Sequence, residues 1–193
     1  MHFILASASP RRQELLRQIG LAFSVMPSGI DESVEPSAAP DDPKIMVRIL
    51  AERKIDAVIR RGLPPETIVI GADTVVVLNG KVYGKPSDAN EACRMLSELS
   101  GREHCVITGV AAAKEGRLVS DVCTTLVRLC PLSDEEIRRY VASGEPLDKA
   151  GAYGIQGLGA LIVDSISGCY FNVVGLPLVT LSRLLRDLGV RLL

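Results

Sequence analysis

One short segment combines hydroxyls with arginines, the side chains that bind phosphate groups: Ser7-Ala8-Ser9-Pro10-Arg11-Arg12. An apolar strand is predicted before it, and a helix is predicted to begin at Pro10, with Ser9 as its N-cap. Backbone N–H groups at the start of a helix favour an anion, and hydroxyls and arginines add further donors. The segment therefore predicts either a phosphate-binding site or a helix cap followed by two solvated arginines.

A carboxylate interrupts a second apolar segment. Asp73 follows Ile68-Val69-Ile70, and Val75-Val76-Val77 comes after Thr74. Burying a carboxylate without a partner is costly, so we expect Asp73 to face a cation, a metal ion or a polar cleft. The alternative interpretation is a surface bend within a hairpin.

Three further positions carry charge, but none is specific by itself. Glu32 lies in a polar, proline-rich loop over residues 27–43, and Lys54 lies on a predicted helix with many charges. Lys85 lies in a Gly-Lys-Pro turn that is similar to the end of a phosphate-binding P-loop. Pro86, however, stands where that motif has the Ser or Thr that binds magnesium. A lone lysine in such a turn is usually solvated.

A glycine-rich run from Gly154 to Gly159 carries Gln156. The order of its glycines differs from the dinucleotide-binding fingerprint, and no helix clearly follows it. The run therefore predicts either a turn that lets the backbone approach a ligand or an ordinary loop.

Together, these candidates have the parts of a metal-dependent phosphate site. The carboxylates are Asp73 and Glu32, and the cations are Arg11, Arg12, Lys54 and Lys85. Carboxylate oxygens are hard ligands that suit Mg²⁺ or Mn²⁺. The spacing of the residues does not show whether they converge.

The elements expected to position these residues alternate between strands and helices. Strands are predicted at residues 3–6, 22–26, 67–78, 81–83, 103–114, 117–130, 160–164 and 169–173. Helices are predicted at residues 10–19, 43–61, 88–99, 133–142 and 176–188. Hairpins at Asn79-Gly80 and Glu115-Gly116 indicate a mixed rather than a purely parallel sheet.

The pattern predicts an α/β fold in which a mixed, twisted sheet is flanked by helices. We expect one domain over residues 1–193, with two lobes around a central cleft and the second lobe built from the hairpin in the middle of the chain. Ser87 is expected to cap the helix at 88–99. On the helix at 43–61, the apolar residues near one face are Ile45, Ile49, Ile55 and Ile59.

The composition excludes several classes of function. The 193 residues include 22 Lys and Arg against 23 Asp and Glu, a formal net charge of −1 that gives no electrostatic footprint for nucleic acid or an anionic membrane. No apolar run reaches about 18 residues, and the N-terminus lacks the basic start of a signal peptide. Five cysteines without CxxC spacing predict reduced thiols in a cytoplasmic protein. With two histidines, a Ser-His-Asp triad or a multi-histidine metal site is not expected.

The chain resembles the Maf family of nucleoside triphosphate pyrophosphatases over essentially its whole length. Besides the Ser7–Arg12 and Gly84-Lys85-Pro86 segments, four motifs occur in the family's order: Gly29-Ile30-Asp31-Glu32, Gly71-Ala72-Asp73-Thr74, the Gly144–Gly151 segment and Val174-Gly175-Leu176-Pro177. Six ordered motifs are far more specific than any one of them.

The resemblance implies hydrolysis of a nucleoside triphosphate between the α- and β-phosphates, with a divalent metal, usually Mg²⁺. It also implies a fold shared with the inosine triphosphate pyrophosphatases, and a homodimer. The family's catalytic acid or base falls on Asp73, which with Glu32 is a candidate metal ligand. The other active-site charges fall on Arg12, Glu32, Lys54 and Lys85.

Three positions separate the family's branches. The branch that acts on dTTP and UTP has Arg, Thr and Gln, which match Arg11, Thr74 and Gln156. The branch that acts on 7-methyl-GTP has Trp, Gln and Glu there. A neutral amide offers both a donor and an acceptor, which suits the edge of a pyrimidine. The resemblance therefore favours dTTP and UTP.

Two alternatives stay open beside this prediction. The chain could be a nucleotide-binding regulator of cell division and septum formation with little turnover, which the family's older name suggests. It could also perform the same hydrolysis on modified nucleotides as a house-cleaning activity. Binding without release of pyrophosphate would favour the first, and the substrate preference would separate the second.

Overall fold

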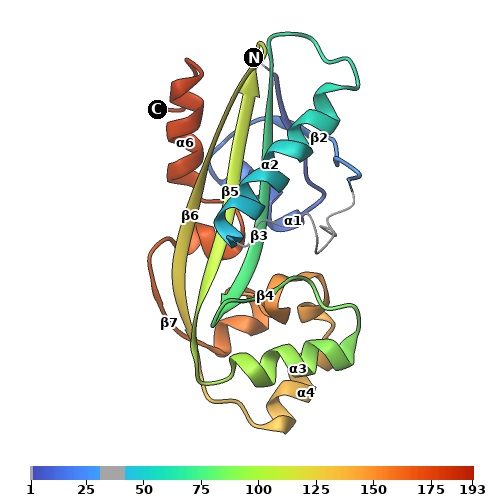
Figure 1. Ribbon diagram of the computed structural model, residues 1–193, viewed down its shortest axis with the longest axis vertical. Coiled ribbons are helices and arrows are strands. Elements are labelled where there is room, and N and C mark those ends of the chain that lie inside the picture. Colours follow the sequence, from blue (N-terminus) through green and yellow to red (C-terminus); the bar gives the residue numbers. More distant parts are fainter. Residues whose placement is uncertain (1, 31–41) are drawn as a thin grey trace. The chain divides into compact units, whose positions relative to one another are not determined.

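The computed structural model describes residues 2–30 and 42–193. Its strands are β1 (His2–Leu5), β2 (Phe23–Val25), β3 (Thr67–Leu78), β4 (Lys81–Tyr83), β5 (Glu103–Lys114), β6 (Arg117–Leu129) and β7 (Val163–Ser167). They form one sheet in the order β2-β1-β3-β5-β6-β7, with β4 paired to β3 (Figure 1). β1 is parallel to β2 and β3, whereas β3–β4 and β6–β7 are antiparallel. The predicted mixed α/β sheet is confirmed.

Helices flank this sheet and connect its strands. They are α1 (Pro10–Gln18), α2 (Pro43–Ile59), α3 (Ala89–Leu99), α4 (Asp134–Ala142), α5 (Tyr170–Val174) and α6 (Leu178–Asp187). Three short 3-10 helices follow α4: η1 (Glu145–Asp148), η2 (Ala150–Ala152) and η3 (Gly157–Leu161). Glu32 and the loop around it fall within residues 31–41, outside the described residues.

The described chain divides into two compact units. The first comprises residues 1–73, 108–123 and 175–193, and the second comprises residues 74–107 and 124–174. The strands β3, β5 and β6 each contribute residues to both units. The prediction that the central hairpin builds the second lobe is therefore only partly right, because the turn of that hairpin belongs to the first unit. The single-domain organisation and the central cleft stay predictions.

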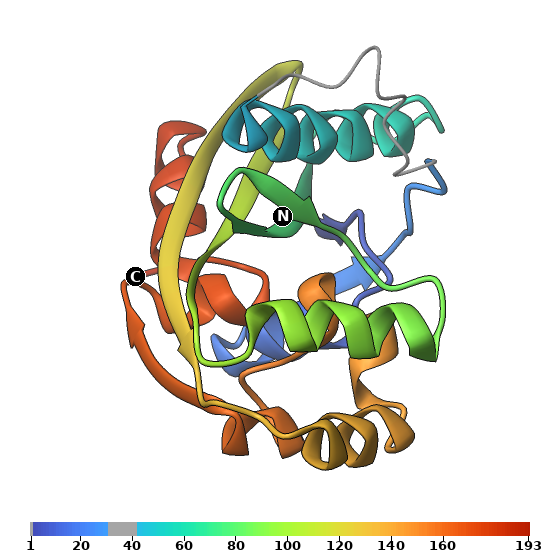
Figure 2. The same ribbon diagram turned by 60° about the horizontal axis from the view of Figure 1, so that its bottom comes forward.

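In the first unit, α2 packs very closely on β3 and β5 (Figure 1). A Cβ atom added at Gly71 would lie 2.5 Å from the carbonyl oxygen of Ala51, and one at Gly109 would lie 2.3 Å from that of Val47. Glycine is therefore required at both strand positions for the helix backbone to approach. α6 lies on the other side of the strands (Figure 2), where Arg183 contacts Asp121 of β6 at 3.7 Å.

The buried face of α2 differs from the predicted one. Ile45 and Ile59 are exposed, and only Ile55 of the predicted four is fully buried. The residues that face the sheet recur at helical spacing: Val47, Leu50, Ala51, Lys54, Ile55 and Val58. Counting isoleucines alone selected the wrong face, because Val, Leu and Ala supply most of the buried surface.

The second unit has its own apolar core. α3 packs against α4 and η2, and side chains from these helices meet residues from β3, β5 and β6. Its β3–β4 hairpin turns at Asn79 and Gly80, both with positive φ, as predicted. The helix cap is one residue later than predicted: Asp88, rather than Ser87, accepts the backbone N–H of Glu91.

The segment predicted as a strand at 169–173 is instead the helix α5, and one strand, β7, precedes it. Its β-branched and aromatic composition favours a strand, but tertiary contacts override that preference. The side-chain amide of Asn172 is buried and donates to the carbonyl oxygen of Val106 at 2.9 Å and to the hydroxyl of Thr125 at 3.0 Å. Asn172 makes both hydrogen bonds while it is part of the helix α5.

His104 is buried on β5 and does not resemble a catalytic base. Its Nε2 lies 2.7 Å from the hydroxyl of Tyr153, and burial lowers the pKa of the imidazole to about 4. The ring is therefore neutral near pH 7 and serves the core. The five cysteines, each partly buried, form no disulfide in the structure. Within the described ranges, no helix is both long and apolar enough to cross a membrane.

Candidate active site

A buried ion pair lies at the centre of the first unit's candidate site. The Nζ of Lys54 donates to Oδ1 of Asp73 at 2.6 Å and lies 3.3 Å from the carbonyl oxygen of Ala72. The side chains of Lys54 and Asp73 are 3% and 9% exposed. Asp73 therefore lies within a continuous strand and faces a cation, as one of the two interpretations predicted, rather than a surface bend.

Arg12 reaches the same strand from α1. Its Nε donates to the carbonyl oxygen of Gly175 at 2.8 Å, and its Nη1 donates to the carbonyl of Ala72 at 2.8 Å and to the hydroxyl of Ser7 at 3.1 Å. Arg12 and Lys54 thus share one acceptor, the Ala72 carbonyl. The structure therefore brings Ser7 and Arg12, which are close in the chain, together with the distant Lys54 and Asp73.

The turn before α1 is shaped by Ser7 and Pro10. The backbone N–H of Ser9 donates to the hydroxyl of Ser7 at 3.2 Å, and Pro10 takes the first helical position, as predicted. Ser9 is the N-cap residue, but its side chain makes no capping hydrogen bond. Arg11 is half-buried, whereas Arg12 is buried, so the two neighbouring arginines have different environments.

The other predicted site residues belong to the second unit. Thr74 is half-buried, and because successive side chains of a strand point to opposite faces, it does not share the face on which Asp73 meets Lys54. Lys85 is exposed, in the segment after β4. Gln156 is half-buried at the start of η3.

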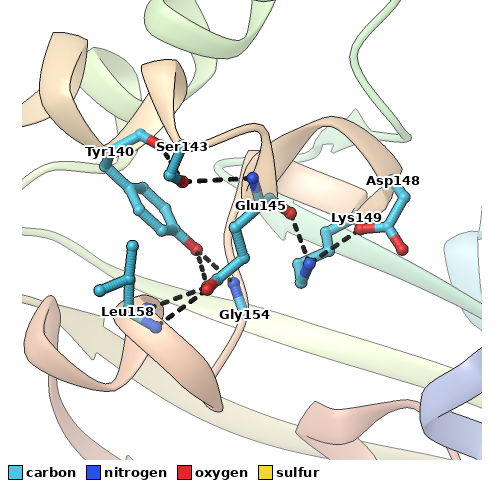
Figure 3. A network of polar contacts seen from close by, with 8 residues as sticks. Tyr140, Ser143, Glu145, Asp148, Lys149, Gly154 and Leu158 are labelled. Atoms are coloured by element: carbon cyan, nitrogen blue, oxygen red, sulfur yellow. Dashed lines mark hydrogen bonds and ion pairs between the residues drawn. The ribbon is translucent and has the colours of Figure 1, made fainter.

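Sequence reasoning missed a network around Glu145, shown in Figure 3. One carboxylate oxygen accepts the Tyr140 hydroxyl at 2.9 Å and the backbone N–H of Gly159 at 3.0 Å. The other accepts the backbone N–H of Leu158 at 2.9 Å. Burial acts to raise the pKa of Glu145, but these hydrogen bonds outweigh it and lower the pKa. The carboxylate is thus ionised and anchors the segment just after Gln156.

The same network explains the glycine-rich run. A Cβ at Gly157, which has a φ of +65°, would lie 2.5 Å from a carboxylate oxygen of Glu145. A Cβ at Gly159 would lie 2.1 Å from the carbonyl oxygen of Gly154, and one at Gly154 would lie 2.9 Å from Cε of Lys149. The glycines let the chain wrap closely around Glu145 and Lys149, a role that neither predicted interpretation of the run included.

One signal in the sequence could have identified the partner of Asp73, but none identifies Glu145. Lys54 falls on the apolar stripe of α2, and a lysine on a buried face needs an anionic or polar partner. Glu145 lies in the Gly144–Gly151 motif, nine residues before the glycine-rich run begins, but its sequence position alone gives no sign of the contact.

The described residues offer few ligands for a divalent metal. Among the described residues, no three Asp, Glu, His or Cys side chains gather as a metal-binding group. Asp73 supplies one hard oxygen ligand, and Mg²⁺ commonly takes only one or two carboxylates, with phosphate oxygens and water completing its shell. Asp73 therefore fits a metal that arrives with a phosphate substrate better than a resident structural ion.

The sheet and the buried site together define a class of protein. It is a mixed α/β protein in which a buried lysine–aspartate pair lies beside the start of a helix that carries an arginine. A family model described as Maf-like protein matches residues 2–188. The chain belongs to this family, which confirms the resemblance seen in its motifs.

Several relatives match along nearly the full length. A protein from Pelotomaculum thermopropionicum named dTTP/UTP pyrophosphatase is 48% identical, over 98% of both chains. Proteins of the same name from Symbiobacterium thermophilum and Moorella thermoacetica are each 52% identical, over 96% and 97% of this chain and 93% and 95% of theirs. Among solved structures, a Staphylococcus aureus Ham1 protein has a TM-score of 0.49 at 14% identity, covering 84% of this chain and 80% of that one.

Proposed function

We propose that the chain is a nucleoside triphosphate pyrophosphatase that hydrolyses dTTP and UTP to the nucleoside monophosphate and pyrophosphate. The observation that carries the proposal is the buried Lys54–Asp73 pair, with Arg12 bonded to the neighbouring carbonyl. It occurs in a chain whose relatives at 48% and 52% identity are named dTTP/UTP pyrophosphatase.

The residues of the first unit support the chemistry in distinct ways. Asp73 either accepts the proton of the attacking water or holds a metal, and the ammonium group at its Oδ1 keeps the carboxylate in position. Lys54 keeps that carboxylate in place from the buried face of α2. Arg12 directs three N–H groups at protein acceptors, so its chief role is to fix the turn at Ser7 against β3. Ser9 and Arg11, beside that turn, are proposed to contact the substrate.

A divalent cation, Mg²⁺ or Mn²⁺, is proposed as the cofactor, with Asp73 and Glu32 as its protein ligands. When bound, the ion would neutralise negative charge on the triphosphate. Lys85, which is exposed in the segment after β4, is proposed to add positive charge toward the phosphates.

Arg11, Thr74 and Gln156 are proposed to select the base. The amide of Gln156 supplies one donor and one acceptor, as the N3–H and carbonyl edge of uracil or thymine requires. The chain is further proposed to be a cytoplasmic homodimer with a single domain.

A turnover panel tests the proposal. Purified protein with Mg²⁺ is given dTTP, UTP, dCTP, dATP, dGTP and 7-methyl-GTP, and pyrophosphate and orthophosphate are assayed separately. We expect pyrophosphate from dTTP and UTP, and a fall in kcat of about 100-fold or more in Asp73→Asn, because the ionised carboxylate is lost. The exposed Asp164→Asn serves as the matched control and should keep full activity.

Two outcomes of this panel would contradict the proposal. Orthophosphate as the first product would mean that another bond is cleaved. Binding of nucleotides without any turnover would favour a regulator instead. A folded Asp73→Asn variant with undiminished turnover would remove Asp73 from the reaction.

A further inference from the structure

The segment that carries Gln156 is anchored on both sides. After Gln156, the backbone N–H groups of Leu158 and Gly159 both donate to the carboxylate of Glu145. Before it, the N–H of Gly154 donates at 3.2 Å to the Tyr140 hydroxyl, which in turn donates to Glu145. One half-buried carboxylate therefore controls both ends of the short segment (Figure 3).

The main chain at Gln156 is extended, with φ −106° and ψ 168°, and its side chain forms no helix cap. The anchored neighbours therefore fix the backbone from which its side chain extends. Charge-assisted hydrogen bonds to backbone N–H groups are among the stronger polar contacts in proteins. A loop held by them loses little further entropy when it binds a ligand.

The backbone of Glu145 is itself held in place. Lys149 donates to the backbone carbonyl of Glu145 and to Asp148 Oδ1, and the Ser143 hydroxyl accepts the backbone N–H of Glu145 at 3.2 Å. A side chain at Gly157 would displace the carboxylate, so the glycine and Glu145 form one fitted unit. A carboxylate that served only as a polar group on the surface of a loop would not need these supporting hydrogen bonds.

We propose that Glu145 is a positioning residue for base selection: it holds the 154–159 loop so that the Gln156 amide meets the base in one orientation. The inference rests on the proposed function, because it takes Gln156 as the base-reading residue. A loosened loop would let the amide swing and flip, and it could then pair with the edge of cytosine as well as that of thymine or uracil. Selectivity, more than turnover, is therefore the property that depends on Glu145.

The test replaces Glu145 by Gln, which has nearly the same size but brings an NH₂ group toward donors that need an acceptor. We expect the dTTP-to-dCTP ratio of kcat/KM to fall about tenfold, with a smaller change in kcat for dTTP. Glu135→Gln is the matched control, since Glu135 is an exposed carboxylate of α4 that pairs with Arg139. Urea unfolding at pH 7 verifies that each variant is folded.

A double-mutant cycle separates positioning from a general loss of structure. In a Gln156→Ala background, Glu145→Gln should leave the dTTP-to-dCTP ratio unchanged, because there is no amide left to orient. The corresponding ratio of binding affinities is measured with non-hydrolysable α,β-methylene analogues of dTTP and dCTP at equilibrium. An unchanged ratio in folded Glu145→Gln, or equal effects with and without Gln156, would overturn the inference.

The binding arm keeps the two proposals distinguishable. Base-selective binding that depends on Glu145, without hydrolysis, would overturn the proposed function and leave the inference standing. Hydrolysis of dTTP with a base selectivity that is the same with and without Glu145 would support the proposed function and overturn the inference. Absence of nucleotide binding of any kind would overturn both.

Discussion

Lys54 and Asp73 form a buried pair whose members depend on each other. At 2.6 Å, with side chains 3% and 9% exposed, each charge has lost most of its contact with water. Removing one partner leaves the other charge buried and uncompensated, which is strongly destabilising, whereas removing both can be nearly neutral. The pair is therefore a structural element as well as a candidate catalytic one.

Unfolding measurements test this mutual dependence. Lys54→Met should lower the free energy of unfolding by about 3–5 kcal/mol at pH 7, because it leaves the Asp73 carboxylate buried without its cation. Adding Asp73→Asn to Lys54→Met should restore part of that loss, since the uncompensated charge is removed. Urea denaturation of the two single variants and the double variant gives the coupling. Strictly additive losses would show that the pair is not coupled.

Residue types and spacing predicted part of this site. Because it interrupts apolar residues, Asp73 is expected to face a cation, a metal ion or a polar cleft, and in the structure it faces the ammonium group of Lys54. Lys54 was judged unspecific because its helix has many charges, although its position on the apolar stripe pointed to a buried partner. The shared acceptor, the Ala72 carbonyl, could not be predicted, since it depends on how α1 and α2 both approach β3.

At the scale of elements, α2 positions Lys54 through its close packing on the sheet. The helix backbone approaches β5 at Gly109 and β3 at Gly71, two residues before Asp73. A Cβ added at Gly109 meets only helix backbone, and one at Gly71 meets the Ala51 carbonyl as well as the Ile55 side chain, so the helix itself must move.

Gly109→Ala should therefore lower the free energy of unfolding by about 1–3 kcal/mol, the usual range for overpacking a close-packed interface. Gly84→Ala is the matched control, because an added Cβ at Gly84 meets nothing within 4 Å and should change stability by less than about 0.5 kcal/mol. Chemical denaturation of both variants provides the comparison. Equal stability of the two would contradict the close packing of α2.

Most elements could be predicted from periodicity and turn residues, and the failures have a common cause. The hairpin turns at Asn79-Gly80 and Glu115-Gly116 have positive φ values, which Gly and Asn adopt readily and Glu adopts only rarely. α5 was predicted as a strand because its local composition resembles one. Its true form depends on the buried contacts of Asn172, which join residues far apart in the chain. Local patterns carry no information about such contacts.

At the scale of the whole molecule, the proposed site residues are drawn from both compact units. Asp73, Lys54 and Arg12 belong to the first, whereas Lys85 and Gln156 belong to the second. The division falls within β3, between Asp73 and Thr74. The sequence predicted two lobes but not this boundary, because a strand that serves both units has one unbroken pattern. Family membership over residues 2–188 covers both units together.

The central claim is that water attacks the α-phosphorus of dTTP or UTP. Hydrolysis in ¹⁸O-labelled water, followed by mass spectrometry of the products, tests it most directly. The account predicts one ¹⁸O atom in the thymidine or uridine monophosphate and none in the pyrophosphate. Label in the pyrophosphate, or labelled orthophosphate as the first product, would contradict it.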